Sequence, residues 1–204
     1  MITIIDYKMG NLGSIVNMLK KIGSDAKISS DLSVIERSEK LILPGVGAFD
    51  TGMKNIAEMQ LLPILEQKAF QDRVPILGIC LGMQLMTKSS EEGQLKGLGW
   101  LQAKTIRFKF EKSDPKLRIP HMGWNFIKKT KDSSLLKEVD ESFRFYFVHS
   151  YHVVCENPGD VLAVTNHGYD FTSMFQKDNI AGVQFHPEKS HKFGMRILKN
   201  FVEC

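Results

Sequence analysis

The chain has 204 residues, of which 43% are hydrophobic and 25% are charged, as in an ordinary globular protein large enough to bury its own core. We therefore expect a single domain over residues 1–204. The net charge is only +4 and the basic residues are scattered, which argues against a nucleic-acid-binding protein. The densest basic run, residues 128–131, is interpreted as a solvated turn.

Membrane and secreted classes are also disfavoured. No apolar run reaches the length of a membrane span, and residues 1–5 lack the basic start of a secretion signal. The chain has three cysteines, an odd number that argues against a disulfide framework and for a reducing compartment. We therefore expect a cytoplasmic protein with neither a membrane nor a nucleic-acid partner.

The first half alternates strand patterns with helical ones. Buried strands are expected at residues 2–5, 40–43 and 74–79. Apolar residues at 15, 18, 19 and 22 have helical spacing, and further helices are expected around residues 53–57 and from Pro63 onward. This alternation predicts an α/β fold with a mostly parallel central sheet and flanking helices.

The second half is rich in short β patterns separated by turns. These lie at residues 100–110, 124–128, 143–148, 151–155, 161–165 and 171–176. They predict a mixed or antiparallel extension of the sheet. A polar loop is expected at 112–118, and a closing helix from about residue 189, with Phe193, Ile197 and Phe201 four residues apart.

The segment 75–84 is the strongest functional signal. An apolar strand pattern leads into a Gly-Ile-Cys-Leu-Gly turn at 78–82 and then into a helical pattern. This is the thiol version of a nucleophile elbow, in which a sharp turn exposes a side chain at a helix N-terminus. Unpaired N–H groups at such a terminus favour a thiolate, so Cys80 is the candidate nucleophile. A buried structural cysteine is the alternative, and it is our interpretation for Cys155 in a strand; Cys204 is assigned to the tail.

The second signal is Gln-Phe-His-Pro-Glu at 184–188. His186 and Glu188 lie two residues apart, on one side of an extended chain. The imidazole can take a proton from a thiol and return it to a leaving amine, while the carboxylate orients the ring. Together with Cys80, this pair forms the minimum set for acyl transfer through a thioester. Any one of the six histidines taken alone is more often a packing residue.

Three weaker patterns complete the interpretation. Gln84 lies one helical turn after Cys80, and the Pro-Gly-Val-Gly turn at 44–47 can direct N–H groups toward a developing oxyanion. The segment 9–13 lacks the spacing of a dinucleotide fingerprint. Zinc-ligand spacing is missing too, so we expect neither a metal nor a cofactor.

Taken together, these motifs resemble those of the class I, or triad-type, glutamine amidotransferases. Within that family the chain is most similar to the glutaminase subunits of bacterial imidazole glycerol phosphate synthases. The likeness covers nearly the whole chain, through the segments 6–12, 44–47, 78–84, 97–100, 120–125, 146–151 and 184–190.

The resemblance implies the fold of that family, with L-glutamine hydrolysed to glutamate and ammonia at a triad of Cys80, His186 and Glu188. It implies glutamine binding by Gly47, Gln84, His149 and Ser150. It implies an oxyanion site made by the N–H groups of Val46 and Leu81. It also implies a (β/α)8-barrel cyclase partner in a heterodimer, contacted by Asn11, Trp124, Tyr146 and Lys189.

In such a complex the ammonia passes to the barrel subunit, which makes imidazole glycerol phosphate and AICAR in histidine biosynthesis. Lys8 stands where a small residue is expected in the segment 6–12. The segments 168–171 and 191–194 resemble a paralogous group that supplies ammonia for sugar amidation in surface polysaccharides. Two further alternatives are a catalytically idle partner-binding module and a free-standing cysteine hydrolase.

Overall fold

The computed structural model describes residues 1–110 and 117–204, within which ten strands form one continuous sheet. Half of this sheet is parallel. The parallel strands, in spatial order, are β2 (Ala26–Ser29), β1 (Ile2–Ile5), β3 (Lys40–Leu43), β4 (Ile76–Ile79) and β12 (Ile180–Val183). The predicted parallel core is therefore confirmed.

The antiparallel half continues from β12. Its strands are β11 (Tyr169–Lys177), β10 (Val161–His167), β7 (Lys128–Lys129), β9 (Tyr151–Cys155) and β5 (Ala103–Arg107). β10 pairs with β11 and with β7, whereas β9 joins β11 to β5. A separate antiparallel pair consists of β6 (His121–Phe126) and β8 (Arg144–His149). The predicted antiparallel extension is confirmed.

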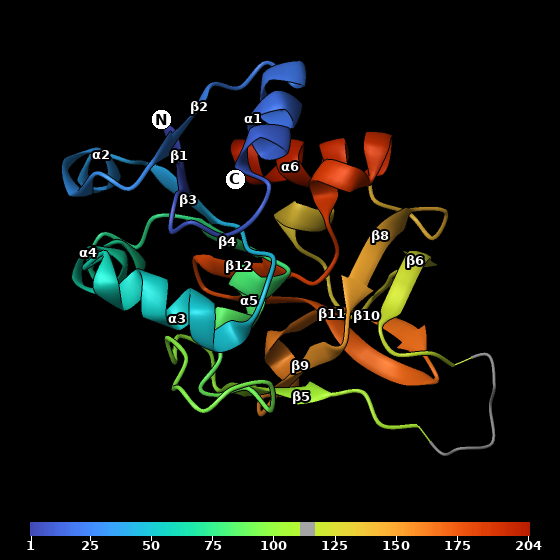
Figure 1. Ribbon diagram of the computed structural model, residues 1–204. Helices are drawn as coiled ribbons and strands as arrows, with labels where there is room; N and C mark the ends of the chain where they lie inside the picture. The colour runs from blue at the N-terminus through green and yellow to red at the C-terminus, as the bar shows by residue number, and fades with distance from the viewer. Residues whose placement is uncertain (111–116) are drawn as a thin grey trace.

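Helices cover both faces of the parallel half. The α-helices are α1 (Leu12–Lys21), α2 (Leu32–Glu36), α3 (Phe49–Glu58), α4 (Leu62–Glu66), α5 (Leu81–Leu85) and α6 (His191–Glu203). Shorter helical turns are η1 (Gln67–Gln71), η2 (Ser134–Leu136), η3 (Pro158–Asp160) and η4 (Pro187–Lys189). In Figure 1, α1 and α6 lie together on one side of the sheet, and α3 to α5 lie on the other. Across the described ranges, no helix combines the length and apolar character needed to cross a membrane.

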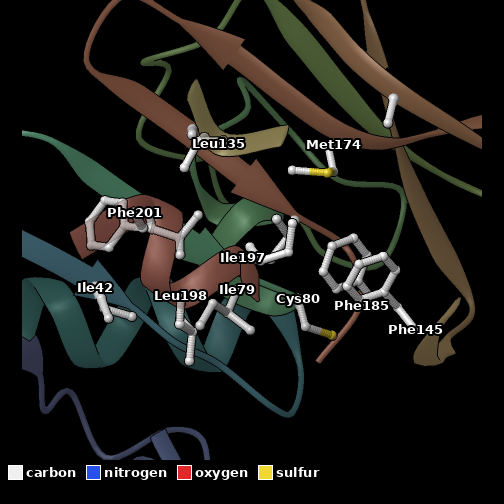
Figure 2. Packing of buried hydrophobic residues seen from close by; sticks show 14 of the residues in the cluster. Ile42, Ile79, Cys80, Leu135, Phe145, Met174, Phe185, Ile197, Leu198 and Phe201 are labelled. Atoms are coloured by element: carbon white, nitrogen blue, oxygen red, sulfur yellow. The ribbon is translucent and has the colours of Figure 1, made fainter. Parts of the chain in front are cut away.

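The strand residues divide between two core layers because successive side chains point to opposite faces. Ile4 and Ile42 belong to the layer under α1 and α6. Their neighbours Ile5 and Leu41 belong to the layer under α3 and α5. Figure 2 shows the first layer, in which Ile197 and Leu198 of α6 pack near Ile79, and Cys80 lies at its edge beside Phe185.

Several expectations need correction. The basic run at 128–131 is not a simple turn, because Lys128 and Lys129 form β7 at the outer edge of the sheet, where charged side chains suit an exposed strand. The strand expected at 124–128 begins earlier, at His121, since its whole length pairs with β8. Most of the polar loop expected at 112–118 lies outside the described residues.

One missed strand, β12, positions the site. This strand has only four residues and all of them are buried, so it shows no alternating pattern. β12 runs parallel to β4, with Gly182 opposite Gly78 and Val183 opposite Ile79. Because the two strands end at the same edge of the sheet, the segments that follow them meet there.

Candidate active site

The chain makes a strained turn at Cys80, between β4 and α5. Cys80 has φ of 52° and ψ of −107°, a conformation that residues with a Cβ adopt only under constraint. The flanking glycines permit this turn. A Cβ on Gly82 would lie 1.7 Å from the Leu43 carbonyl oxygen, and a Cβ on Gly78 would lie 2.8 Å from the Met83 backbone. The predicted elbow is therefore formed, with Cys80 at the N-cap of α5.

The end of β12 brings His186 and Glu188 to this elbow. The Cys80 N–H donates to the Val183 carbonyl at 2.8 Å, which holds the two strand ends together. Beyond β12 the backbone stays extended at His186 and then enters η4. His186 Nδ1 lies 2.7 Å from Glu188 Oε1, and both side chains are buried. The predicted imidazole–carboxylate pair is present.

Electrostatics at His186 favour its protonated form. Burial lowers the pKa of this imidazole, but hydrogen bonding and negative charge from Cys80 and Glu188 outweigh burial and raise the pKa to about 10. The buried His186 Nε2 has no hydrogen-bond partner among the described residues. We therefore attribute the effect of Cys80 mainly to its charge. A nearby imidazolium and sulphur can act together as an ion pair.

Cys80 and His186 line a cavity of about 280 Å³. The remaining lining residues are Val46, Gly47, Leu81, Gln84, Glu92, Pro120, Val148, His149, Ser150 and Tyr151. A larger cavity of about 770 Å³ lies beside β6, β7 and β10, but no residue lining it lines the Cys80 cavity. The smaller cavity is the candidate site because it contains the thiol and the imidazole.

The oxyanion pair predicted from Val46 and Leu81 is not assembled in this structure. The Leu81 N–H donates to the Gly45 carbonyl oxygen at 3.3 Å, so this donor is already occupied. An N–H in the first turn of a helix has no partner within the helix, and the nearest carbonyl satisfies it. Val46 remains half-exposed at the cavity.

The structure brings together the four residues expected to bind substrate: Gly47, Gln84, His149 and Ser150. Gln84 Nε2 donates to the Tyr151 carbonyl at 3.1 Å and to Gln184 Oε1 at 3.0 Å, which leaves only its own carbonyl oxygen for a ligand. The His149 ring is also engaged, through Nδ1 with Tyr151 and through Nε2 with His121. At 149–150, the Ser150 carbonyl oxygen already accepts the Phe108 N–H at 3.0 Å, so the other backbone groups and the Ser150 side chain are left for a ligand.

Three of the four residues expected at a partner interface form one cluster. The ring centroids of Trp124 on β6 and Tyr146 on β8 lie 6.2 Å apart, and Lys189 Nζ lies 5.8 Å from the centroid of the Tyr146 ring. Asn11 caps α1 by accepting the Ser14 N–H. Since α1 contacts η4, which carries Lys189, Asn11 belongs to a neighbouring element.

Sequence reasoning missed three polar residues at or near the cavity. Glu92 lines it from a loop, and one of its oxygens accepts the Phe49 N–H at 2.9 Å. Gln184 is fully buried, and its Nε2 lies 3.6 Å from the Cys80 sulphur. His121 bonds to His149. Only Gln184 had a local signal, since it precedes His186 by two residues on an extended chain.

His121 belongs to a group of four histidines, with His149, His152 and His167, around Phe108. Burial lowers the pKa of His121 and of His152 to about 4. Burial also places the pKa of His149 well below its usual value. His121, His149 and His152 are therefore neutral rings that serve as hydrogen-bonding core residues. Within residues 1–110 and 117–204, no three or more potential ligands are arranged to hold a metal ion.

Comparison with known proteins agrees with this geometry. The family model for glutamine amidotransferase class-I matches residues 3–204. The chain is 56% identical to the imidazole glycerol phosphate synthase subunit HisH 2 of Methanococcus maripaludis, over 100% of this chain and 99% of that protein. It is 48% identical to the protein of the same name from Pseudomonas aeruginosa, over the same shares.

A solved structure supports the fold. The crystal structure of a glutamine amidotransferase from Thermotoga maritima superposes with a TM-score of 0.67 at 18% identity, covering 99% of this chain and 80% of that one. At this low identity, the superposition supports only a shared fold. The full-length family match and the relatives at 56% and 48% identity show that the chain belongs to the class-I glutamine amidotransferase family.

Proposed function

We propose that this chain is a glutaminase subunit that hydrolyses L-glutamine to glutamate and ammonia through a thioester on Cys80. The observation that carries the proposal is the meeting of the Cys80 elbow with the His186–Glu188 pair at the ends of β4 and β12. The same edge of a sheet is where open α/β folds place their ligands. Residues 1–204 would act as a single domain.

The chemistry follows from the charges in the cavity. The Cys80 thiolate attacks the side-chain carbonyl carbon of glutamine, and the C–N bond breaks as His186 gives its Nε2 proton to the departing amide nitrogen. Ammonia leaves and a glutamyl thioester remains. Water then loses a proton to His186 and attacks the thioester, and the C–S bond breaks to return the thiolate. Glu188 holds the imidazole by its Nδ1 throughout.

The cavity also suggests how glutamine is held. Its volume of about 280 Å³ suits an amino acid rather than a larger ligand. Glu92 has one carboxylate oxygen on the Phe49 N–H, and its other oxygen can receive the substrate ammonium. The Gln84 carbonyl oxygen, the backbone around Gly47 and the 149–150 segment complete the proposed contacts.

The occupied Leu81 N–H implies a resting state. Stabilising the tetrahedral intermediate requires two donors on its oxygen, and Leu81 now donates to Gly45. Rotation of the peptide between Gly45 and Val46 would withdraw this carbonyl and turn the Val46 N–H toward the substrate. We propose that binding of the partner and its ligand drives this rotation and thereby gates ammonia release.

The proposed docking face lies on β6. Met122, Trp124 and Phe126 alternate along its outer side and are 62%, 43% and 53% exposed. Monomeric proteins rarely leave such an apolar stripe uncovered. The names of the relatives suggest a second subunit of an imidazole glycerol phosphate synthase as the partner. From the family resemblance, we propose that this partner is a (β/α)8-barrel cyclase that consumes ammonia to make imidazole glycerol phosphate and AICAR in histidine biosynthesis.

A second candidate is ammonia supply to a sugar-amidating enzyme of polysaccharide biosynthesis. Its support comes from His191, which belongs to the segment that resembles this paralogous group. The His191 ring stacks on Trp124 at 5.7 Å with an interplanar angle of 5°. The unusual segment therefore lies on the docking face, where a different partner would be recognised. The chemistry at Cys80 would be the same.

Glutamate formation from glutamine tests both candidates. The assay compares the chain alone, the chain with the co-encoded barrel protein and its nucleotide ligand, and Cys80→Ala in the same mixture. Strong stimulation by the barrel protein, with loss of turnover in Cys80→Ala, is the expected result. An imidazole product identifies the histidine route. Stimulation by a sugar-amidating enzyme instead identifies the second candidate, and turnover retained by Cys80→Ala would refute the thioester mechanism.

A further inference from the structure

A single backbone carbonyl, that of Tyr151, sets the direction of hydrogen bonds on both sides of the active-site wall. It accepts from Gln84 Nε2 at 3.1 Å and from His149 Nδ1 at 2.7 Å. A carbonyl oxygen has no proton to give, so Gln84 must present its amide nitrogen and His149 must carry its proton on Nδ1. The amide orientation of Gln84 and the tautomer of His149 follow from this one acceptor.

The first arm leads to the thiol. Since Gln84 Nε2 faces Tyr151, its second hydrogen meets Gln184 Oε1 at 3.0 Å. This contact orients the Gln184 amide so that Nε2 faces the Cys80 sulphur at 3.6 Å. Gln84, Gln184 and Cys80 are only 5%, 0% and 7% exposed, so water competes little for these bonds. The Cys80 sulphur therefore receives an N–H donor from Gln184. The orientation of this donor is fixed by the Tyr151 carbonyl, through the Gln84 amide.

The second arm leads to β6. Because His149 carries its proton on Nδ1, its Nε2 accepts from His121 Nδ1 at 3.0 Å. His121 Nε2 is then an acceptor and receives the Asn125 amide at 3.1 Å. The same Asn125 nitrogen donates to the Asn166 carbonyl at 2.9 Å. Each N–H hydrogen in this arm has its own acceptor, because the Asn125 amide nitrogen carries two hydrogens. The lowered pKa values of His121 and His149 keep both rings neutral.

The two arms form one chain from Asn125 to Cys80. His121 and Asn125 lie on the inner side of β6, whereas Met122, Trp124 and Phe126 lie on its outer side. A protein that binds the outer side therefore contacts the same strand that holds the start of the chain. A shift of β6 changes the His121–His149 bond first, and the orientation of the Gln184 amide last.

We propose that Gln184 is a positioning residue that stabilises the Cys80 thiolate, and that the chain through Gln84, Tyr151, His149 and His121 couples this residue to the docking strand β6. An N–H donor favours a sulphur anion over a neutral thiol. The consequence for catalysis rests on the proposed glutaminase function. The contact with sulphur itself does not, because it can be measured without glutamine.

Alkylation of Cys80 by iodoacetamide, followed by mass spectrometry of the Cys80 peptide, measures this contact directly. In Gln184→Met, which keeps the size of the side chain but removes the donor, the rate at pH 7 should fall about tenfold. The control Gln102→Met changes an exposed glutamine that takes no part in this series of hydrogen bonds, and it should keep the wild-type rate.

A matched pair at position 121 tests the longer coupling. His121→Phe keeps an aromatic ring but removes the donor to His149, whereas His121→Gln retains one donor and one acceptor. The phenylalanine variant should slow alkylation at pH 7 and weaken stimulation by the partner, and the glutamine variant should restore both. Equal behaviour of the two variants would overturn the coupling.

Alkylation at pH 7 within twofold of wild type in Gln184→Met would overturn the role of Gln184. If that variant does not fold, Gln84→Met replaces it, because loss of the Gln84 amide removes the constraint on Gln184, and an unchanged rate there has the same meaning. Slower alkylation in Gln184→Met, with a wild-type protein that fails to hydrolyse glutamine even with partner, would refute the glutaminase proposal and leave the thiolate contact standing.

Discussion

Lowering the pH from 7 to 5 should destabilise this protein through its buried histidines. Burial lowers the pKa of His152 to about 4, against the opposing effects of the Val153 carbonyl and the Glu91 carboxylate. His121 has the same value, through burial and the nearby charge of His167. An unfolded histidine has a pKa of about 6.5, so between pH 4 and 6.5 the unfolded state binds more protons. Stability is therefore fully present above pH 6.5 and is lost as the pH falls toward 4.

The magnitude follows from proton linkage. For one histidine shifted from 6.5 to about 4, the loss between pH 7 and pH 5 is about 2 kcal/mol. His121 and His152 together account for about 4 kcal/mol, and His149 adds to this in the same direction. A natural domain has a total stability of about 5–15 kcal/mol, so the effect is large enough to measure.

Urea unfolding at pH 7, 6 and 5 and constant ionic strength measures this loss. The test variant is His152→Phe, which keeps an aromatic ring beside Phe108 and removes the titratable group. Its change in unfolding free energy between pH 7 and 5 should be about 2 kcal/mol smaller than that of wild type. Phe171→Leu is the matched control, since it alters the same aromatic cluster without altering proton binding. Equal pH dependence in wild type and His152→Phe would refute the reasoning.

Four further predictions concern the elbow and its surroundings. In Cys80→Ser the pKa of His186 should fall below its value of about 10, because the charge of the sulphur is removed while burial remains; imidazole NMR titration measures this. The raised pKa also predicts that the contribution of His186 to stability is complete below pH 6.5 and is lost as the pH rises toward 10, which unfolding at both limits would check. Gly82→Ala should cost about 2 kcal/mol or more and abolish activity, because the new Cβ meets the Leu43 carbonyl; a wild-type urea midpoint would contradict this. Trp124→Ala should weaken partner stimulation with an unfolding free energy within about 1 kcal/mol of wild type, because its ring is 43% exposed, and an unchanged coupled rate would remove it from the docking face.

Much of the fold was predictable because local patterns persist in the structure. The apolar runs at β1, β3 and β4 remain buried strands, and the spacing of Ile15, Met18 and Leu19 places them on the buried side of α1. The elbow at Cys80 was predictable for the same reason, since its strand, glycines and helix are consecutive in the chain.

Contacts between distant segments were beyond these patterns. β12 has four buried residues and no alternation, yet its pairing with β4 brings His186 to Cys80. The chain from Asn125 through Tyr151 to Gln184 joins residues from several strands, and no spacing along the sequence encodes it. The occupied Leu81 N–H depends on which way the Gly45 peptide faces. The sequence determines which side chains are present and what chemistry each can perform. The direction of each hydrogen bond and the position of each proton depend on which acceptor lies opposite each donor, and tertiary packing determines that pairing.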